Sequence, residues 1–198
     1  ILVCLVGSEM CIRDSTTKII GDRAFSSNIN IVNKIGDLVI EKFHYNKIGT
    51  VIKHIPGHGL AKSDSHIRTP YIYKNLNYLK RNDFKVFKNK KSIFAMTAHI
   101  IFSKIDPTYT VTHSKKLINI IRNEINFKNL IISDDISMKS LKFSTLTNTQ
   151  KAFQAGCNLV LHCNARMSEM KVVAENSPKL DNFLLKKTLE FYKLVNIK

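Results

Sequence analysis

Four short, almost continuously apolar runs are spaced along this chain of 198 residues, and they constrain its fold more than any other feature. Runs that are apolar at nearly every position are typical of parallel strands buried on both faces, whereas half-exposed strands alternate. The sequence therefore predicts an α/β fold built on a parallel sheet. The runs occupy residues 49–55, 93–99, 130–134 and 158–162.

Segments with helical periodicity separate these runs. Val32, Ile35, Val39 and Phe43 recur at helical spacing, which predicts an amphipathic helix over residues 29–44. Strand and helix thus alternate, as in parallel sheets with crossover connections. Further helices are expected over residues 73–84, over residues 117–125 with Ser114 as the N-cap, over residues 147–155 and over about 180–195.

Polar side chains gather where the apolar runs end, at Lys53, His54, His99, Asp134 and His162. A β/α barrel places its active site at these strand ends, and so does a doubly wound sheet. No GxGxxG motif or P-loop follows any run, which disfavours the nucleotide-binding folds. A whole barrel takes about 250 residues. We therefore predict a partial (β/α)8 TIM barrel, comprising about the last four strands, with its N-terminal part missing.

The first fifteen residues do not continue this pattern. Their apolar start is like the core of a signal peptide, but no positive residue precedes it and no small-x-small cleavage site follows. The stretch resembles a translated sequencing artefact. We therefore predict that residues 1–15 are a non-native leader and that residues 16–198 are the C-terminal part of one barrel domain.

A formal net charge of +16 is the one unusual feature of the composition. A basic chain can be a nucleic-acid-binding module, and this interpretation stays open as an alternative. The lysines are scattered, however, and do not alternate with aromatic residues that could stack on bases. A surface of solvated lysines explains the charge equally well. One short cluster contains Lys85, Lys88, Lys90 and Lys91.

Cysteine spacing and hydropathy exclude some other classes. None of the cysteines forms a CxxC pair, so neither a zinc knuckle nor a redox motif is indicated. No apolar run reaches about 18 residues, so no membrane-spanning helix is predicted.

The densest polar cluster lies between residues 53 and 66. Its histidines and aspartate support two chemical interpretations. His54, His58, Asp64 and His66 could ligate a metal ion in a metal-dependent hydrolase. Alternatively, Asp64 orients His66 for proton transfer. The cluster could also be a Pro-Gly-rich turn without a chemical role, and the residue types alone do not choose among the three.

A second cluster, Ser133-Asp134-Asp135, ends the third apolar run. Strand side chains alternate between faces, so only one of the two carboxylates can readily face a barrel axis. Asp135 could instead cap a following helix.

Together these motifs resemble the β-N-acetylhexosaminidases of glycoside hydrolase family 3. The resemblance is carried by KHIPGHG, by DSH followed by TP, by MTAHI and by IISDDISM. IGDRAF before them and AGCNLVLHCN after them are similar to further blocks of the family. The motifs stand in the family's order and cover nearly all of residues 18–165.

The resemblance implies a fold, an activity and a set of site residues. The activity is that of a retaining β-N-acetylhexosaminidase, which releases terminal β-linked N-acetylglucosamine without a metal or another cofactor. Asp134 matches the nucleophile, and His66 matches the acid/base with Asp64 as its dyad partner. Lys53, His54 and Arg23 match residues that bind the sugar. His58 matches a histidine that shapes the loop.

This chemistry is reasonable for these residue types. A carboxylate can attack the anomeric carbon and form a covalent glycosyl-Asp intermediate. An imidazole with an ordinary pKa near 6.5 can act as an acid and then as a base at neutral pH. The family's first strands, which include an acidic sugar-binding residue, have no counterpart here. We therefore expect this fragment itself to be inactive.

Family analogy also predicts the biological setting. The expected substrate is a small carbohydrate, namely a muropeptide or anhydro-muramyl sugar that contains N-acetylglucosamine. The expected role is peptidoglycan recycling in the cytoplasm, by a monomer without a nucleic-acid partner.

Overall fold

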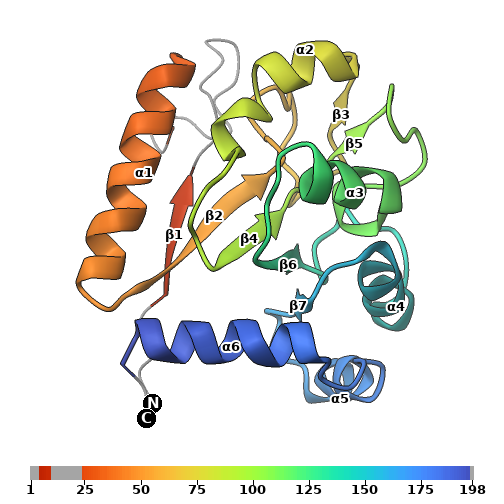
Figure 1. Ribbon diagram of the computed structural model, residues 1–198. Coiled ribbons are helices and arrows are strands. Elements are labelled where there is room, and N and C mark those ends of the chain that lie inside the picture. Colours follow the sequence, from red (N-terminus) through yellow and green to blue (C-terminus); the bar gives the residue numbers. More distant parts are fainter. Residues whose placement is uncertain (1–4, 10–23, 197–198) are drawn as a thin grey trace.

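The computed structural model describes residues 5–9 and 24–196, in which a five-stranded parallel sheet carries the helices (Figure 1). The strands are β1 (Leu5–Glu9), β2 (Gly49–Ile55), β4 (Phe94–Thr97), β6 (Leu130–Asp135) and β7 (Leu159–Leu161). A separate pair of short parallel strands comprises β3 (Tyr71–Ile72) and β5 (Ile101–Phe102).

The strand order distinguishes this sheet from a doubly wound one. Neighbours follow one another in chain order, β1-β2-β4-β6-β7, without the reversal that marks a doubly wound sheet. Because parallel crossovers are right-handed, such an order places the connecting helices on one face, as in a barrel. The predicted parallel α/β fold is confirmed. The helices are α1 (Ile29–Tyr45), α2 (Leu76–Arg81), α3 (Lys115–Asn123), α4 (Thr145–Ala155), α5 (Met167–Glu175) and α6 (Asn182–Leu194).

Side-chain caps explain where several helices begin and end. Asn28 accepts hydrogen bonds from the N–H groups of Asn30 and Ile31 at the start of α1. Ser114 Oγ accepts the N–H of Leu117 at 3.2 Å, which confirms the predicted N-cap of α3. α4 ends at Gly156, whose φ of 112° is accessible to glycine at little cost.

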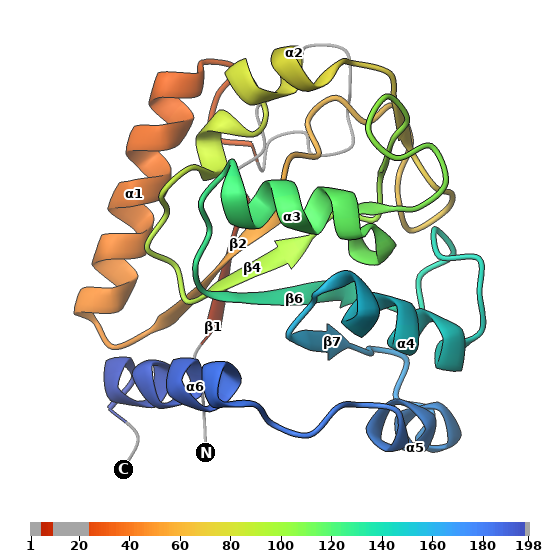
Figure 2. The ribbon, with the colours of Figure 1, turned by 45° about the vertical axis from the view of Figure 1, so that its right-hand side comes forward.

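Alternating strand side chains build two hydrophobic clusters. Ile52, Ala95 and Ile131 point into the larger cluster, which includes residues of α1, α3 and α4. Their neighbours Val51, Phe94 and Leu130 pack on the other side, against Leu184 and Phe191 of α6. Figures 1 and 2 show α6 lying below the sheet, where the strands begin. The helix thus covers the end of the sheet opposite to the polar strand ends.

The predicted elements recur with shifted bounds, and others were not predicted. The four apolar runs are β2, β4, β6 and β7. The helix α5 was not predicted, because its sequence carries no N-cap side chain and buries none of its residues. The strands β3 and β5 contain two residues each, which is too short for a periodic pattern.

The strand β1 lies inside the segment that we predicted to be a non-native leader. Its backbone pairs with β2 in register from Leu5 opposite Gly49 to Glu9 opposite Lys53. Backbone hydrogen bonds do not depend on side-chain identity, so an apolar extended segment of any origin can add to a sheet edge. The origin of residues 1–15 therefore stays a prediction.

Within the part of the chain that the structure describes, no helix is both long enough and apolar enough to cross a bilayer.

Candidate active site

Asp134 lies at the C-terminal end of β6, beside the end of β2. Its Oδ2 is 3.5 Å from Nε2 of His54, and each of these side chains is 14% exposed. Its Oδ1 accepts the N–H of Asp135 at 2.8 Å. Leu130 and Ile132 belong to the hydrophobic cluster that packs against α6. Strand alternation therefore puts Asp134, two residues after Ile132, on the sheet face that would form a barrel interior.

The carboxylate of the next residue, Asp135, holds the backbone of two neighbouring segments. Asp135 Oδ1 accepts the N–H of Ser137 at 3.0 Å and the N–H of Cys163 at 3.1 Å. It thereby joins the turn after β6 to the end of β7. The expectation that Asp135 could cap a helix is wrong, because it closes a turn and α4 begins only at residue 145.

The loop after β2 folds tightly over the sheet. Cis peptide bonds occur at Lys53–His54 and at Ile55–Pro56. Gly57 has a φ of 149°, and a Cβ there would lie 2.6 Å from Cβ of Asp83. Only glycine fits such a conformation and such a close approach. The Pro-Gly turn of the motif thus has a direct steric explanation.

His58 lies buried between the strand end and the rest of the loop. Its ring centroid is 5.3 Å from that of His54, and its Nε2 is 3.4 Å from Ser65 Oγ. These contacts fit the loop-shaping role that the resemblance implies.

Asp64 and His66 form the predicted pair. Asp64 Oδ1 accepts both the backbone N–H and the Nδ1–H of His66, each at 2.8 Å. The backbone N–H of His66, followed by its ring, lowers the pKa of the Asp64 carboxyl. With the proton on Nδ1, the Nε2 atom remains for a substrate. The side chains are 43% and 76% exposed, respectively, so this pair lies at the surface.

The four residues of the metal alternative separate into two pairs. His54 contacts His58, whereas Asp64 contacts His66. Among the described residues, no three histidine, cysteine, aspartate or glutamate side chains form a group that could hold a metal ion. The geometry of the loop therefore favours the acid/base interpretation over a His54/His58/Asp64/His66 metal centre.

Comparison with known proteins decides the family. The model of the glycosyl hydrolase family 3 N terminal domain matches residues 11–185. The chain belongs to this family. A beta-hexosaminidase of Idiomarina loihiensis is 33% identical over 169 residues, which are 83% of this chain and 51% of that protein. One of Haemophilus influenzae strain PittEE is 31% identical over 195 residues, or 89% and 56% of the two chains. The chain thus spans about half the length of the curated relatives it matches.

Solved structures share the fold. A family 3 beta-N-acetylglucosaminidase from Paenibacillus sp. superposes with a TM-score of 0.86 at 19% identity, covering 98% of this chain and 40% of that one. NagZ from Neisseria gonorrhoeae, in complex with N-trifluoroacetyl-D-glucosamine, gives 0.82 at 22% identity, with 97% and 58% covered. The family domain is a (β/α)8-like barrel, and the parallel strands of this chain form part of one.

In this family 3 chain, a buried hydrogen-bonded series supports β6, the strand that carries Asp134, and sequence reasoning gave it no role. Thr97 Oγ1 lies 2.8 Å from Thr112 Oγ1, which lies 2.7 Å from Nδ1 of His99. His99 Nε2 donates to the carbonyl oxygen of Asp135 at 3.0 Å. Burial lowers the pKa of His99, so the ring is neutral and can accept at Nδ1 while donating at Nε2. Its position at a strand end was the available signal.

His162, at the end of β7, pairs with Glu169 of α5. Its Nε2 lies 2.9 Å from Glu169 Oε2. Hydrogen bonds from His162, and then from Asn164 and Thr145, lower the pKa of Glu169 to about 2. Sequence reasoning missed this pair because it did not predict α5. The pair fixes the β7–α5 connection beside the site.

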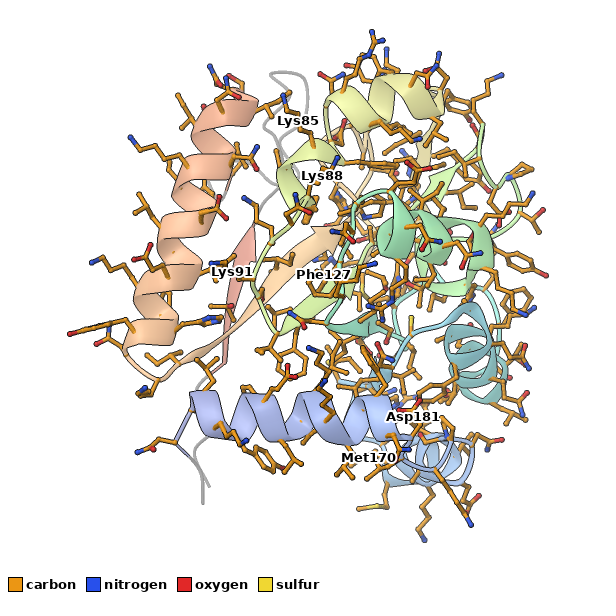
Figure 3. The ribbon with its side chains drawn as sticks, in the orientation of Figure 1. Lys85, Lys88, Lys91, Phe127, Met170 and Asp181 are labelled. Carbon is orange, nitrogen blue, oxygen red and sulfur yellow. The ribbon has the colours of Figure 1, made fainter. Side chains whose placement is uncertain are left out.

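Burial divides the lysine cluster. Lys85, Lys88 and Lys91 are exposed along the segment between α1 and α3 (Figure 3), whereas Lys90 is buried. The ammonium of Lys90 is buried and lies 2.8 Å from Asp37 Oδ1, which neutralises it. This arrangement does not favour the nucleic-acid alternative. Arg23, predicted to bind the sugar, lies outside the described residues.

Proposed function

We propose that this chain carries the catalytic strand ends of a retaining β-N-acetylhexosaminidase. The observation that carries the proposal is the joint placement of Asp134 and His54 on the inner sheet face, with an oriented Asp64–His66 pair in the loop after β2. The relatives named beta-hexosaminidase support the same activity.

The first step would form a glycosyl ester. An Asp134 oxygen attacks the anomeric carbon, and the bond to the leaving oxygen breaks with its electron pair. The imidazolium form of His66 gives its Nε2 proton to that oxygen. The Asp64 carboxylate stabilises the imidazolium through Nδ1. His54 and Lys53 would bind the sugar hydroxyls from the end of β2.

The second step would release the sugar. Neutral His66 takes a proton from water, and the water oxygen attacks the anomeric carbon as Asp134 departs with the ester electron pair. Two displacements on the same carbon retain the anomeric configuration. The product is N-acetylglucosamine.

The substrate would be a small carbohydrate with a terminal β-linked N-acetylglucosamine. We extend the proposal to muropeptide-derived sugars, peptidoglycan recycling, a cytoplasmic location and a monomeric enzyme. These finer points rest on the family resemblance. The Neisseria structure with N-trifluoroacetyl-D-glucosamine supports the sugar class.

The five described parallel strands do not close a barrel, so we propose that activity requires the remaining strands. The test therefore uses the chain joined to the missing strands of a family barrel, referred to below as the completed barrel. A 2-fluoro sugar that traps the covalent intermediate should add one sugar mass, and peptide mapping should place it on Asp134. Labelling of Asp135, or release of product with inverted configuration, would contradict the mechanism.

A further inference from the structure

His99, two residues after β4, is completely buried and lies between a short helical turn and the end of β6. On one side its Nδ1 is 2.7 Å from Thr112 Oγ1, in the 3₁₀ turn Val111–His113. On the other side its Nε2 is 3.0 Å from the carbonyl oxygen of Asp135, the residue after Asp134. The imidazole therefore links the backbone beside the proposed nucleophile to a turn outside the proposed active site.

The carbonyl oxygen of Asp135 fixes the positions of the protons along this series. A carbonyl oxygen can only accept, so Nε2 of His99 carries a proton. Burial lowers the pKa of His99 and outweighs the charge of Asp134, which raises it, so the ring is neutral and Nδ1 has a lone pair. Thr112 Oγ1 must therefore donate to Nδ1, and Thr97 Oγ1, 2.8 Å away, donates to Thr112. All protons of the series thus point toward β6.

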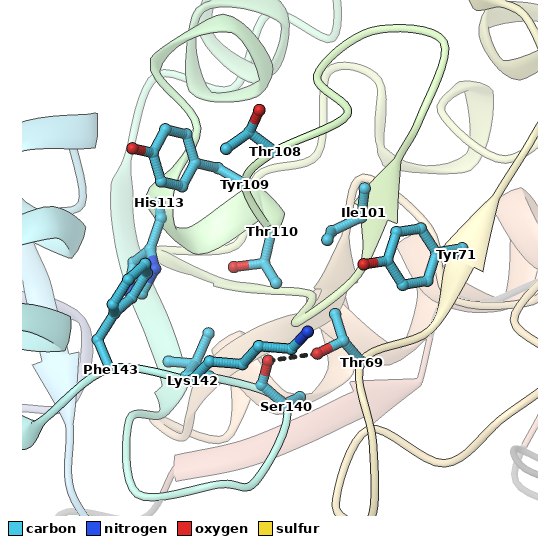
Figure 4. A pocket seen from close by; sticks show the side chains of 11 residues that line it. Thr69, Tyr71, Ile101, Thr108, Tyr109, Thr110, His113, Ser140, Lys142 and Phe143 are labelled. Carbon is cyan, nitrogen blue, oxygen red and sulfur yellow. Dashed lines mark hydrogen bonds between the residues drawn. The ribbon is translucent and has the colours of Figure 1, made fainter.

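The packing of the 3₁₀ turn leaves Thr112 to face His99. Val111 is buried in the larger hydrophobic cluster, and His113 and Thr110 line a small cavity (Figure 4). Among the described residues, Thr112 is the only side chain that hydrogen-bonds the His99 ring. Both residues are completely buried, so loss of the Thr112 hydroxyl would leave Nδ1 without a partner, which is costly.

Asp135 transmits the order of the series to Asp134. Its N–H donates to Asp134 Oδ1 at 2.8 Å, while its carbonyl oxygen accepts from His99. The backbone of Asp135 is therefore held on both sides of its Cα atom. The contact with His99 restricts the rotation that would carry this N–H away from Oδ1, and so helps to fix the plane of the Asp134 carboxylate.

A neutral ring is also the form that this position requires. His99 lies close enough to Asp134 for the carboxylate to raise the pKa of the ring, although burial has the larger effect. A positive charge on the ring would pair with the carboxylate in the free enzyme, and stabilising the ground state does not speed a reaction. By donating to Nδ1, the Thr112 hydroxyl occupies the nitrogen that would otherwise take a second proton.

We propose that His99 is a positioning residue for the proposed nucleophile Asp134, held in its neutral, Nε2-protonated form by the hydroxyls of Thr97 and Thr112. The inference rests on the proposed function for the identity of the nucleophile. The hydrogen bonds of the series themselves do not depend on it.

The first test is NMR spectroscopy of the 198-residue chain labelled with ¹⁵N. At neutral pH, Nε2 of His99 should give the shift of a protonated nitrogen, and Nδ1 that of an unprotonated one. Thr112→Val keeps the side-chain shape but removes the donor to Nδ1, so hydrogen exchange of the Asp135 amide should accelerate roughly fivefold, the effect of one neutral hydrogen bond. Thr112→Ser retains the hydroxyl and should exchange at the parent rate.

A matched control removes another buried threonine hydroxyl. Thr149→Val breaks a hydrogen bond to the carbonyl oxygen of Thr145 within α4 and should not change exchange at Asp135. A parent ring protonated at Nδ1, or equal exchange at Asp135 in Thr112→Val and the parent chain, would overturn the series as described.

The second test measures how fast a 2-fluoro sugar traps the completed barrel. His99→Leu removes the donor to the Asp135 carbonyl oxygen, whereas the longer amide side chain of His99→Gln can still supply one. His99→Leu should slow trapping by roughly 10- to 10²-fold, because small displacements of reacting groups are costly. It should leave equilibrium binding of N-acetylglucosamine nearly unchanged, and His99→Gln should recover most of the rate. Rates are expressed per site that is finally labelled, so unfolded enzyme does not contribute.

The labelled residue separates this inference from the proposed function. If the sugar labels Asp134 but His99→Leu is trapped at the parent rate, the positioning role is overturned while the nucleophile stands. Equal slowing in His99→Leu and His99→Gln would also overturn it, because the Nε2 donor would then have no part in the effect. If the sugar labels a residue other than Asp134, the proposed function falls, and the positioning role falls with it.

Discussion

Asp134 and His66, the two proposed catalytic groups, lie in regions of opposite character. Asp134 ends a central strand, is 14% exposed, and is flanked by Asp135, whose carbonyl oxygen is held by buried His99. His66 is 76% exposed, and its hydrogen bonds to Asp64 reach back only two residues. One group is positioned by the sheet, and the other by a local turn.

This difference matches what each group must do. A nucleophile gains from a fixed position at the anomeric carbon, and rigid elements provide it. A proton-transfer group must serve a leaving oxygen and then a water, while substrate enters and product leaves. Loops supply such movable groups in many enzymes. The proposed nucleophile Asp134 is thus preorganised by long-range contacts, whereas the proposed acid/base His66 is oriented by Asp64 and positioned by its loop.

The largest effect should come from Asp134→Asn in the completed barrel. An amide is a very poor nucleophile, so kcat should fall by roughly 10³-fold or more while sugar binding changes little. Asp135→Asn is the matched control, because its carboxylate closes a turn instead of facing the sugar. Steady-state rates and equilibrium binding of N-acetylglucosamine give the readout. Equal losses of kcat in the two variants would contradict the proposal that Asp134, and not Asp135, is the nucleophile.

A smaller, substrate-dependent effect is expected for His66→Ala. Loss of a general acid costs roughly 10²- to 10⁴-fold for poor leaving groups. A nitrophenyl glycoside needs little protonation and should lose much less in the glycosylation step. Asp64→Asn should give a milder loss with a shifted pH profile, since it removes the charge that supports imidazolium. Pre-steady-state rates on both substrate types test this, and identical factors would argue against the acid role.

The free energy of unfolding should also depend on pH, because His113 is buried in the folded chain. Because the pKa of His113 falls from 6.5 to about 4 on folding, the unfolded chain binds more protons between these values. Stability should therefore decrease as pH falls from about 6.5 to about 4, by on the order of 3 kcal/mol, and the contribution should level off below that. Urea unfolding at about pH 7 and about pH 4.5 measures it. His113→Gln should show a smaller decrease, and His99 and His44, whose pKa values burial also lowers, contribute to the remainder. An unchanged pH dependence would count against the burial of His113.

Local patterns were sufficient to predict four of the strands and the polar residues at their ends. The near-continuous apolar runs predicted β2, β4, β6 and β7, because strands buried on both faces leave that signature. The residue types between 53 and 66 left three interpretations open, and the family resemblance selected the Asp64–His66 pair, whose contact the structure shows. Strand alternation predicted that Asp134 and Asp135 face opposite sides, and the family resemblance selected Asp134.

Long-range contacts were not predictable in this way. Thr112 supports His99, and His113 lines a small cavity together with Thr110 and Ser140, although neither Thr112 nor His113 stands in a pattern that marks chemistry. Their importance arises from the folding of the β5–α3 loop against other segments. The sequence also did not predict that α6 packs against the starts of the strands. The amphipathic pattern of a helix shows that one face is buried but not which surface it packs on.

The smallest effect concerns the hydrogen bond that joins the two regions. Thr69 Oγ1 donates to the Ser140 carbonyl, and so connects the end of the dyad loop to the segment after the nucleophile. Thr69→Val keeps the side-chain shape but removes this bond, which should cost about 1 kcal/mol of stability. If the bond also positions the loop, glycosylation of poor leaving groups should slow a few-fold, while nitrophenyl glycosides should react at nearly the parent rate. Thr69→Ser, which retains the hydroxyl, should restore both. Equal slowing on both substrate types would instead mean that Thr69 affects the position of Asp134, the proposed nucleophile, and not that of His66.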